Sequence, residues 1–367
     1  MRPEVAVFTD TYLPTVNGVT YTIEAWRDCW ERRGGRMGVV YPGSDHVPSA
    51  SEHPVTSVPF PFYEGFHVGL PRVPAAVRDA DLVHSHTPFG IGLAGYRLAR
   101  RRDVPFIVSF HTPTSEYASY LFDSRLAAFV ERVANGYETR YLNRADHVVT
   151  PSQSARARLL DRGVEPPITV VSNGIDVDRF APSDGDAFRE AYDLPSGPLV
   201  GYTGRHGYEK RLEDVVDAAE GLDVSVVFGG DGPARAALET RAAEADIDVR
   251  FLGFLDRDEL PAFYSALDAF VFPSPVETQG LVALEAIACG TPVVAVDAGA
   301  LADTVEEGST GYHYAPGDVS GFRAAIRRTL DERARLRTSC LVARERMSVE
   351  RAVDTLESVY RVSLEQY

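Results

Sequence analysis

The chain has 367 residues, 44% of them hydrophobic, and a formal net charge of −16 at pH 7. This length is too great for one ordinary domain and fits two, and the apolar content suffices for two buried cores, which excludes a disordered chain. The acidic balance disfavours nucleic acid as a partner, because phosphate binding needs a basic face.

Short β-branched and aromatic runs alternate with longer helix-like stretches along the chain. Continuous apolar runs separated by helical patterns are typical of buried parallel strands in βα units. In the first half the expected strands are Val5–Phe8, Met37–Tyr41, Leu82–His84, Phe106–Phe110, His147–Thr150 and Ile168–Val171. In the second half they are Leu199–Tyr202, Val224–Phe228, Val249–Leu252, Ala269–Phe272, Pro292–Val296 and Gly311–Tyr314.

Two such sets predict an α/β protein with two doubly wound, Rossmann-like domains rather than one oversized sheet. We place the first domain at 1–171 and the second at 172–345, because the turn signal Ser172-Asn173-Gly174 follows the sixth strand. Prolines between Val58 and Phe66 exclude a regular element there. The aromatic residues of that stretch fit either a binding surface or a loop pinned onto its own domain.

Ligands of doubly wound sheets bind at the carboxyl ends of strands, so the residues after each strand are the candidates. Asn17-Gly18, before the first helical pattern, lets the backbone approach a ligand and aims N–H groups at an anion. Asn-Gly is equally a common turn. His111 follows the fourth strand, where a histidine is as typical of hydrogen-bonded structure as of function.

Gly204, Arg205 and Lys210 follow the first strand of the second half. A forked guanidinium and a compact ammonium can together bind one diphosphate. Two solvated cations are the alternative, but Lys210 is the single lysine of a chain that otherwise uses Arg, which favours function. Gly230 lies in a Gly-rich turn after the next strand.

Further along, a loop holds Glu277, Gly280 marks a turn, and residues 281–288 have a helical pattern. The amides of 279–281 would lie at the helix N-terminus, where the dipole favours a phosphate. Glu285 could accept hydrogen bonds from a ribose diol, and Glu277 could hold sugar hydroxyls. A capping Glu277 and a solvent-exposed Glu285 would explain each residue singly, but not the whole group.

Together these motifs resemble glycosyltransferase family 4, a family of retaining enzymes with the GT-B fold. The resemblance covers nearly the whole chain and rests on Asn17-Gly18, His84 to Phe89, Ser109 to Thr112, Ser172 to Asp176, Gly204-Arg205 with Lys210, Gly230 to Pro233, and Glu277 with Glu285. The spacing of the two glutamates is the specific element. The family implies an acceptor-binding and a nucleotide-sugar-binding domain facing across a cleft, with a C-terminal helix, 346–367, packing back on the first.

By resemblance, Arg205 and Lys210 hold the diphosphate, Glu285 binds the ribose, and Glu277 approaches the donor sugar, which His111 faces from the other domain. These roles make His111, Glu277, Arg205 and Lys210 the catalytic set. The implied donor-binding residues are Asn17, Gly18, Gly204, Arg205, Lys210, Gly230, Glu277, Thr278, Gln279, Gly280, Leu281 and Glu285. Arg211 follows Lys210 where many members have Gly.

No metal or cofactor is expected besides the UDP- or GDP-sugar substrate, since the resembled family needs none. Asp-x-Asp patterns, among them those beginning at Asp176, Asp246 and Asp256, are expected by chance in so acidic a chain. We expect Asp256 or Asp258 to cap a helix.

Within the family, the chain looks most like the lipid glucosyl- and mannosyltransferases that act on diacylglycerol or phosphatidylinositol. The implied acceptor side consists of Asp10, Tyr12, His111, Glu116 and Tyr117. An Arg cluster (Arg97, Arg100, Arg101 and Arg102) and a Trp26–Trp30 pair can hold a protein on an anionic membrane. A solvated face and two core tryptophans are the alternative.

The acid excess lies beyond residue 170, since residues 1–170 hold 18 Arg and 18 Asp plus Glu. Acidity with one lysine is typical of a halophilic protein. The three cysteines are scattered, which predicts a cytoplasmic protein. A strand-like run begins close to Met1, and no apolar run reaches about 18 residues, so we expect neither a signal peptide nor a membrane span. A lipid acceptor would bring it to the inner face of the cell membrane.

The expected reaction is metal-independent transfer of a hexose to an acceptor hydroxyl with retained configuration. No residue is placed as a nucleophile, so a front-face route fits better than a covalent intermediate. The alternatives are a sugar-nucleotide epimerase of the same fold, a transferase with a soluble glycan acceptor, and a silent binding subunit. A pyridoxal-phosphate-dependent phosphorylase needs a Schiff-base lysine, but the single lysine lies in the phosphate-binding position.

Overall fold

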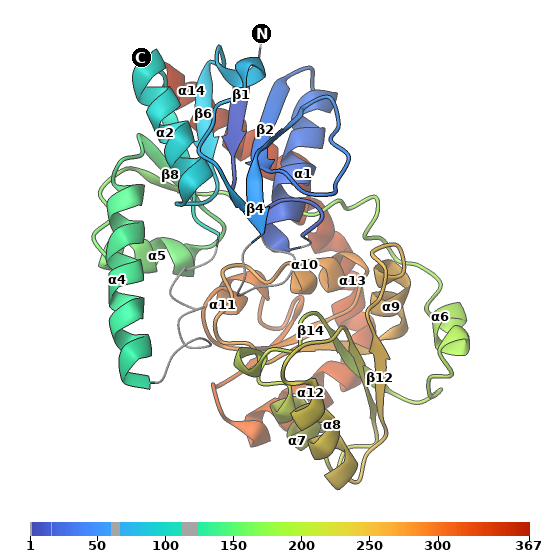
Figure 1. The fold of residues 1–367 in the computed structure, drawn as a ribbon. Helices are drawn as coiled ribbons and strands as arrows, with labels where there is room; N and C mark the ends of the chain where they lie inside the picture. The colour runs from blue at the N-terminus through green and yellow to red at the C-terminus, as the bar shows by residue number, and fades with distance from the viewer. Residues whose placement is uncertain (1, 16, 60–66, 112–123) are drawn as a thin grey trace. The chain divides into compact units, whose positions relative to one another are not determined.

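The computed structural model describes the chain except residues 1, 16, 60–66 and 112–123 (Figure 1). Contacts divide it into two compact units: Met1–Gly174 with Val349–Tyr367, and Ile175–Ser348. The two boundaries follow Gly174 and Ser348, each three residues later in the chain than expected. No described helix is long and apolar enough to cross a membrane.

A seven-stranded parallel sheet, in the order β3-β2-β1-β6-β7-β8-β9, forms the first unit. Its strands are β1 (Glu4–Phe8), β2 (Arg36–Pro42), β3 (Glu52–Val55), β6 (Leu82–Ser85), β7 (Phe106–Ser109), β8 (His147–Thr150) and β9 (Ile168–Val170). Its helices are α1 (Gly18–Arg32), α2 (Gly90–Arg102), α4 (Ser124–Leu142), α5 (Gln153–Asp161) and α14 (Val349–Leu364).

Both faces of this sheet are buried, as the continuous apolar strand sequences require. Successive side chains of a strand point to opposite faces. Val5 and Val7 therefore join the core that includes α1 and α14, while Ala6 and Phe8 join the core that includes α2. Trp30 of α1 meets Tyr360 of α14 edge to face, with ring centroids 5.4 Å apart.

The structure decides between the two alternatives for the tryptophans. Trp26 and Trp30 are fully buried core residues, so neither can contact a membrane. The exclusion of a regular element between Val58 and Phe66 was wrong. Val58 and Pro59 lie in a short strand, β4 (Ser57–Pro59), which pairs antiparallel with β5 (His67–Gly69). A two-stranded ribbon tolerates proline because one side of each strand needs no partner. The aromatic residues from 60 to 66 lie outside the described part of the chain.

The second unit has a six-stranded parallel sheet in the order β12-β11-β10-β13-β14-β15, and contains all six expected strands. These are β10 (Leu199–Thr203), β11 (Ser225–Gly229), β12 (Val249–Gly253), β13 (Ala269–Phe272), β14 (Val293–Val296) and β15 (Gly311–Tyr314). Its helices are α6 (Gly185–Ala191), α7 (Glu213–Ala219), α8 (Arg235–Glu244), α9 (Leu260–Ala266), α10 (Leu281–Ala288), α11 (Leu301–Thr304), α12 (Val319–Asp331) and α13 (Arg333–Ala343).

Strand order reverses once in each unit. In the first unit the chain runs outward from β1 to β3 and then from β6 to β9, so the reversal lies between β1 and β6. In the second it lies between β10 and β13. Ligands of open α/β sheets bind outside the carboxyl ends of the strands at such a switch point.

Candidate functional site

The switch point of the second unit brings together two of the sequence-predicted segments. Lys210 ends a short 3-10 helix after β10, and Glu277 lies in the loop after β13. The Lys210 ammonium donates to Glu277 Oε1, and both side chains are largely buried, at 18% and 15% exposed. The predicted phosphate-binding lysine and the predicted sugar-binding glutamate are therefore neighbours.

Arg205, the second candidate cation, is also ion-paired. Its guanidinium donates to Glu209 Oε1, while the side chain remains 45% exposed. Each of the two cations predicted to bind the diphosphate thus faces a carboxylate. A phosphate that binds there must replace Glu209 and Glu277 as the anionic partner.

The Gly-rich turn after β11 holds the backbone of the Arg205 loop. Gly230 and Gly232 both have positive φ, at 98° and 156°. A Cβ at Gly230 would lie 2.0 Å from the Gly204 carbonyl oxygen, and one at Gly232 would lie 2.6 Å from that of His206. Only glycine permits this contact, so the turn positions the loop that carries Arg205.

Helix α10 begins as the sequence predicts. Gly280 is its N-cap residue with φ 78°, and a Cβ there would lie 2.8 Å from Leu301. The first amides of a helix lack partners within it and carry the positive end of the dipole. The segment from Gln279 to Leu281, next to Thr278 and Glu277, can therefore receive an anion.

Glu285 lies inside the unit, which contradicts a solvent-exposed position. Its Oε2 accepts a 2.7 Å hydrogen bond from the hydroxyl of Tyr264, a residue of α9. Burial raises the pKa of Glu285 to about 7, against the opposing effects of the Tyr264 hydrogen bond and the Arg257 charge. The carboxyl group therefore changes protonation near neutral pH.

In the first unit, three histidines gather at the carboxyl ends of β6 and β7. His86 Nδ1 and His111 Nε2 share a 2.7 Å hydrogen bond, and the ring centroids of His84 and His86 are 4.4 Å apart. The Trp26 ring lies within 6.4 Å of all three. Burial lowers the pKa of His84 to about 3 and that of His111 to about 4, so the cluster is neutral at pH 7.

Two of the residues expected on the acceptor side, Asp10 and Tyr12, are held by partners within the first unit. Asp10 is buried and accepts hydrogen bonds from the amides of Ile91 (2.9 Å) and Gly92 (3.3 Å), so it caps α2. Tyr12 is buried in the core, where Arg27 donates to its hydroxyl at 2.8 Å. Both side chains have structural partners. Glu116 and Tyr117 lie outside the described residues.

Two smaller expectations also have outcomes. Asn17 caps α1, since its Oδ1 accepts the Thr20 amide at 3.0 Å, and Gly18 is the first helical residue. The expectation that Asp256 or Asp258 caps a helix was wrong, because the N-cap residue of α9 is Glu259 and makes no side-chain capping bond. Among the described residues, no group of three or more His, Cys, Asp or Glu could hold a metal.

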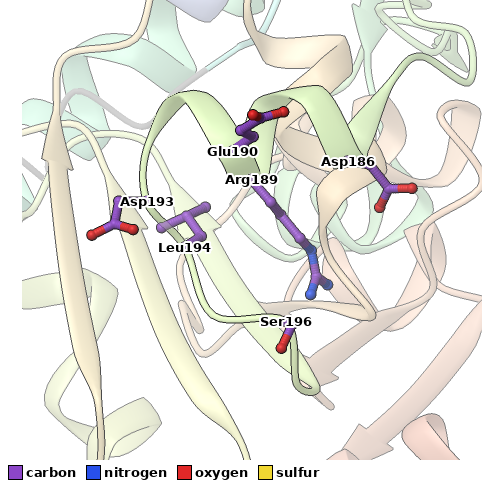
Figure 2. Close-up of a pocket in the computed structure, with 6 residues that line it drawn as sticks. All are labelled: Asp186, Arg189, Glu190, Asp193, Leu194 and Ser196. Carbon is purple, nitrogen blue, oxygen red and sulfur yellow. The ribbon is translucent and has the colours of Figure 1, made fainter.

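A separate pocket lies beside α6, at the other end of the second sheet. Figure 2 shows the residues that line it: Asp186, Arg189, Glu190, Asp193, Leu194 and Ser196. The Arg189 guanidinium donates to the Ala266 carbonyl and to Asp268, which also accepts the Leu199 amide at the amino end of β10. Because Arg189 holds structure at the amino ends of the strands, this pocket is not the candidate site.

Sequence reasoning missed Tyr264 and Glu209. Tyr264 precedes Glu285 by 21 residues on another helix, and no local pattern links them. Glu209 could have been found, because it lies four residues after Arg205, a spacing at which opposite charges pair on helical turns.

Comparison with known proteins identifies two matching families. "Glycosyltransferase Family 4" matches residues 16–179, and "Glycosyl transferases group 1" matches residues 186–345. The chain is 32% identical to the GDP-mannose-dependent alpha-mannosyltransferase of Mycolicibacterium smegmatis, over 88% of this chain and 86% of that protein. It is 33% identical to the 2-deoxystreptamine glucosyltransferase of Streptomyces kanamyceticus, over 74% and 73%.

The chain is also similar to an enzyme of lipid glycosylation and to a solved structure of the same fold. The alpha-monoglucosyldiacylglycerol synthase of Streptococcus pneumoniae is 29% identical, over 79% of this chain and 70% of that protein. The sucrose-phosphate synthase of Thermosynechococcus elongatus superposes with a TM-score of 0.79 and 22% identity over the whole of both chains. That structural likeness shows the two-domain GT-B fold.

Proposed function

Since the chain belongs to glycosyltransferase family 4, a group 1 glycosyltransferase family that uses sugar-nucleotide donors, we propose that it transfers a hexose from UDP- or GDP-sugar to an acceptor hydroxyl with retained configuration. The observation that carries the proposal is the meeting of Lys210 with Glu277 at the switch point of the second unit. A cation for the diphosphate then lies beside a carboxylate for the sugar.

In the proposed donor site, residues of the second unit contact the ribose, the diphosphate and the sugar of the donor. Glu285 would accept the ribose hydroxyls, while Arg205 and Lys210 would hold the diphosphate with the amides at the start of α10. Gly204 and Gly230 would let the backbone come close to the phosphates. Binding of the diphosphate would release Glu277 from Lys210, so that this carboxylate becomes available to the sugar hydroxyls.

The proposed chemistry follows from where positive charge is fixed. Negative charge develops on the diphosphate as the glycosidic bond to it breaks, and preorganised cations and amides stabilise that charge. Arg205, Lys210 and the α10 N-terminus would supply this stabilisation without a metal. The departing phosphate oxygen would help to deprotonate the acceptor hydroxyl on the same face of the sugar, which retains the configuration.

From the first unit, the proposal assigns His111 to the donor sugar and the Asn17-Gly18 backbone to the diphosphate. The low pKa of His111, which burial causes, supports a neutral imidazole that binds a hydroxyl rather than a phosphate. Because the Asn17 side chain already caps α1, we assign the diphosphate contact to the amide of Gly18.

For the acceptor we propose a lipid, at the cytoplasmic face of the cell membrane. Similarity to a glucosyldiacylglycerol synthase supports this choice, whereas similarity to a 2-deoxystreptamine glucosyltransferase supports a soluble acceptor as the second candidate. Membrane contact would have to avoid the buried tryptophans. The Arg cluster of α2 is partly neutralised, since Arg100 pairs with Asp146 and Arg102 with Asp79.

A donor screen followed by transfer assays tests the proposal. Binding of UDP- and GDP-sugars would be measured by thermal shift, and transfer would be measured on diacylglycerol, phosphatidylinositol and soluble glycans, at high and low salt because the chain is acidic. Transfer to a soluble glycan alone would contradict the lipid acceptor. Epimerised or free sugar formed without any acceptor, and no transfer with one, would favour the epimerase.

A further inference from the structure

Glu285 has a hydrogen-bond partner that the proposed function leaves without a role. The Tyr264 hydroxyl donates to Glu285 Oε2 at 2.7 Å, and the two side chains are 0% and 6% exposed. The donor is on α9 and the acceptor on α10, two helices that contact each other in the second unit. This bond therefore orients a carboxylate from a neighbouring helix.

The Tyr264 ring is held on several sides. It packs against Phe270 and Phe263 at centroid distances of 5.6 Å, and lies 6.3 Å from Phe180. The Tyr264 carbonyl also accepts a 2.6 Å hydrogen bond from Thr291 Oγ1. Because the ring and its backbone are both held, the hydroxyl oxygen is fixed beside Glu285 Oε2, to which it donates.

The Tyr264 hydroxyl affects how the Glu285 carboxylate can accept hydrogen bonds from the two hydroxyls of a ribose. An ionised carboxylate has about four acceptor sites on two oxygens, whereas a protonated one gives up part of that capacity. Tyr264 occupies one site on Oε2 and leaves Oε1 for incoming hydroxyl donors. Its donation also favours the ionised form, against the burial that raises the pKa of Glu285 to about 7.

The other titratable groups near Glu285 do not replace this effect. Arg257 acts on Glu285 through its charge, and lowers its pKa less than the Tyr264 hydrogen bond does. Burial raises the pKa of the Cys289 thiol to about 12, so that group stays neutral at pH 7. Tyr264 is itself neutral, since burial raises the pKa of its hydroxyl well above 10. It is thus a proton donor to Glu285 over the whole working range.

We propose that Tyr264 is a positioning residue for nucleoside recognition, which orients the Glu285 carboxylate toward the 2′- and 3′-hydroxyls of the donor ribose and keeps it ionised. This inference rests on the proposed function, because it takes Glu285 as the ribose-binding residue. Tyr264 touches Glu285 and not the reacting atoms, so its effect appears in nucleotide affinity.

The test compares Tyr264→Phe with the parent protein by isothermal titration of UDP and GDP, and of their 2′,3′-dideoxy analogues, between pH 6 and 9. Tyr312→Phe is a matched control, because the buried Tyr312 hydroxyl likewise donates to a glutamate of the same unit, Glu332, at 2.9 Å. For the preferred nucleotide, loss of a hydrogen bond to a charged group predicts affinity reduced about tenfold in Tyr264→Phe.

Three further results are expected. Affinity for the dideoxy analogue stays unchanged, so the preference for the ribose hydroxyls falls. The pH below which nucleotide affinity declines moves upward, because the carboxylate has lost a proton donor and is protonated more easily. Tyr312→Phe behaves like the parent protein. Should Tyr264→Phe not fold, Tyr264→Met, which also lacks the hydroxyl and adapts to irregular space, takes its place.

Failure of the inference is distinct from failure of the proposed function. The role assigned to Glu285 is wrong if the parent protein binds neither UDP nor GDP. It is also wrong if the parent protein binds a nucleotide and its dideoxy analogue with equal affinity. If the parent protein makes that distinction and the Tyr264 variant keeps both its ratio and its pH midpoint, the inference is overturned while the donor site stands.

Discussion

Lys210 and Glu277, which follow neighbouring strands of the second sheet, form an ion pair between the single lysine of the chain and the first of its paired glutamates. Both ends of the pair are assigned to the donor, one to its diphosphate and one to its sugar. Lys210 is therefore already paired with a carboxylate, which the donor diphosphate would replace in the proposed site. This exchange is open to test at several residues.

Replacement of Lys210 by methionine tests its role at the diphosphate. Removing one preorganised charge from a developing anion is expected to lower kcat about 10²- to 10³-fold. Steady-state kinetics with the preferred sugar nucleotide measure the effect. Arg250→Met is the control, since Arg250 lies on β12 and forms its ion pair with nearby Asp248. Parental kcat in a folded Lys210→Met protein would contradict the phosphate assignment.

Substitution of Glu209 by glutamine should strengthen binding of the free nucleotide. In the proposed site Glu209 would compete with the donor phosphate for the Arg205 guanidinium, and neutralising Glu209 would remove the competitor. Because exposed ion pairs are weak, the expected gain in affinity for UDP or GDP is about two- to fivefold by titration calorimetry. Weaker binding would show instead that Glu209 holds Arg205 in its productive position.

Gly230→Ala should destabilise the second unit and Gly221→Ala should do so far less. Both glycines have positive φ, at 98° and 80°, but only at Gly230 would a Cβ meet another atom, the Gly204 oxygen. We expect Gly221→Ala to cost about 1 kcal/mol, the backbone effect alone, and Gly230→Ala to cost at least about 3 kcal/mol. Urea unfolding measures both. Equal losses would contradict the close contact between the two loops.

Acid should destabilise the first unit through its buried histidines. The pKa values of His84 (about 3) and His111 (about 4) lie below the ordinary value of 6.5 in the unfolded chain. Between those values the unfolded state binds more protons, so stability is full above pH 6.5 and falls as the pH drops, by at most about 1.4 kcal/mol per pH unit for each histidine.

Unfolding followed at Trp26 and Trp30 fluorescence checks this pH dependence, because both tryptophans lie in that unit. His111→Asn, which removes one of the titrating groups, should reduce the slope between pH 6.5 and 4.5. An unchanged slope would show that His111 is already protonated in the folded protein.

The buried parallel strands of both sheets could be predicted because such strands are continuous apolar runs, and the glycine turns because only glycine suits their backbone. Strand β3 was missed because it lies at the edge of its sheet and contains Pro54. The direction in which a polar side chain faces was not predictable. The buried side chains of Asp10 and Tyr12 form hydrogen bonds with the Ile91 amide and with Arg27, and Tyr264 forms one with Glu285. These partners lie on other elements, so the local sequence does not indicate them.

The stereochemistry of the product distinguishes a retaining transferase from every alternative reaction of this protein. The protein would be incubated with an α-linked UDP- or GDP-hexose and a lipid acceptor, and the anomeric configuration of the purified glycoside read by NMR. We expect an α-glycoside, which the parent protein forms and the Lys210→Met variant does not. A β-glycoside would contradict retention, and absence of any glycoside with lipid and soluble acceptors alike would contradict the proposed transferase.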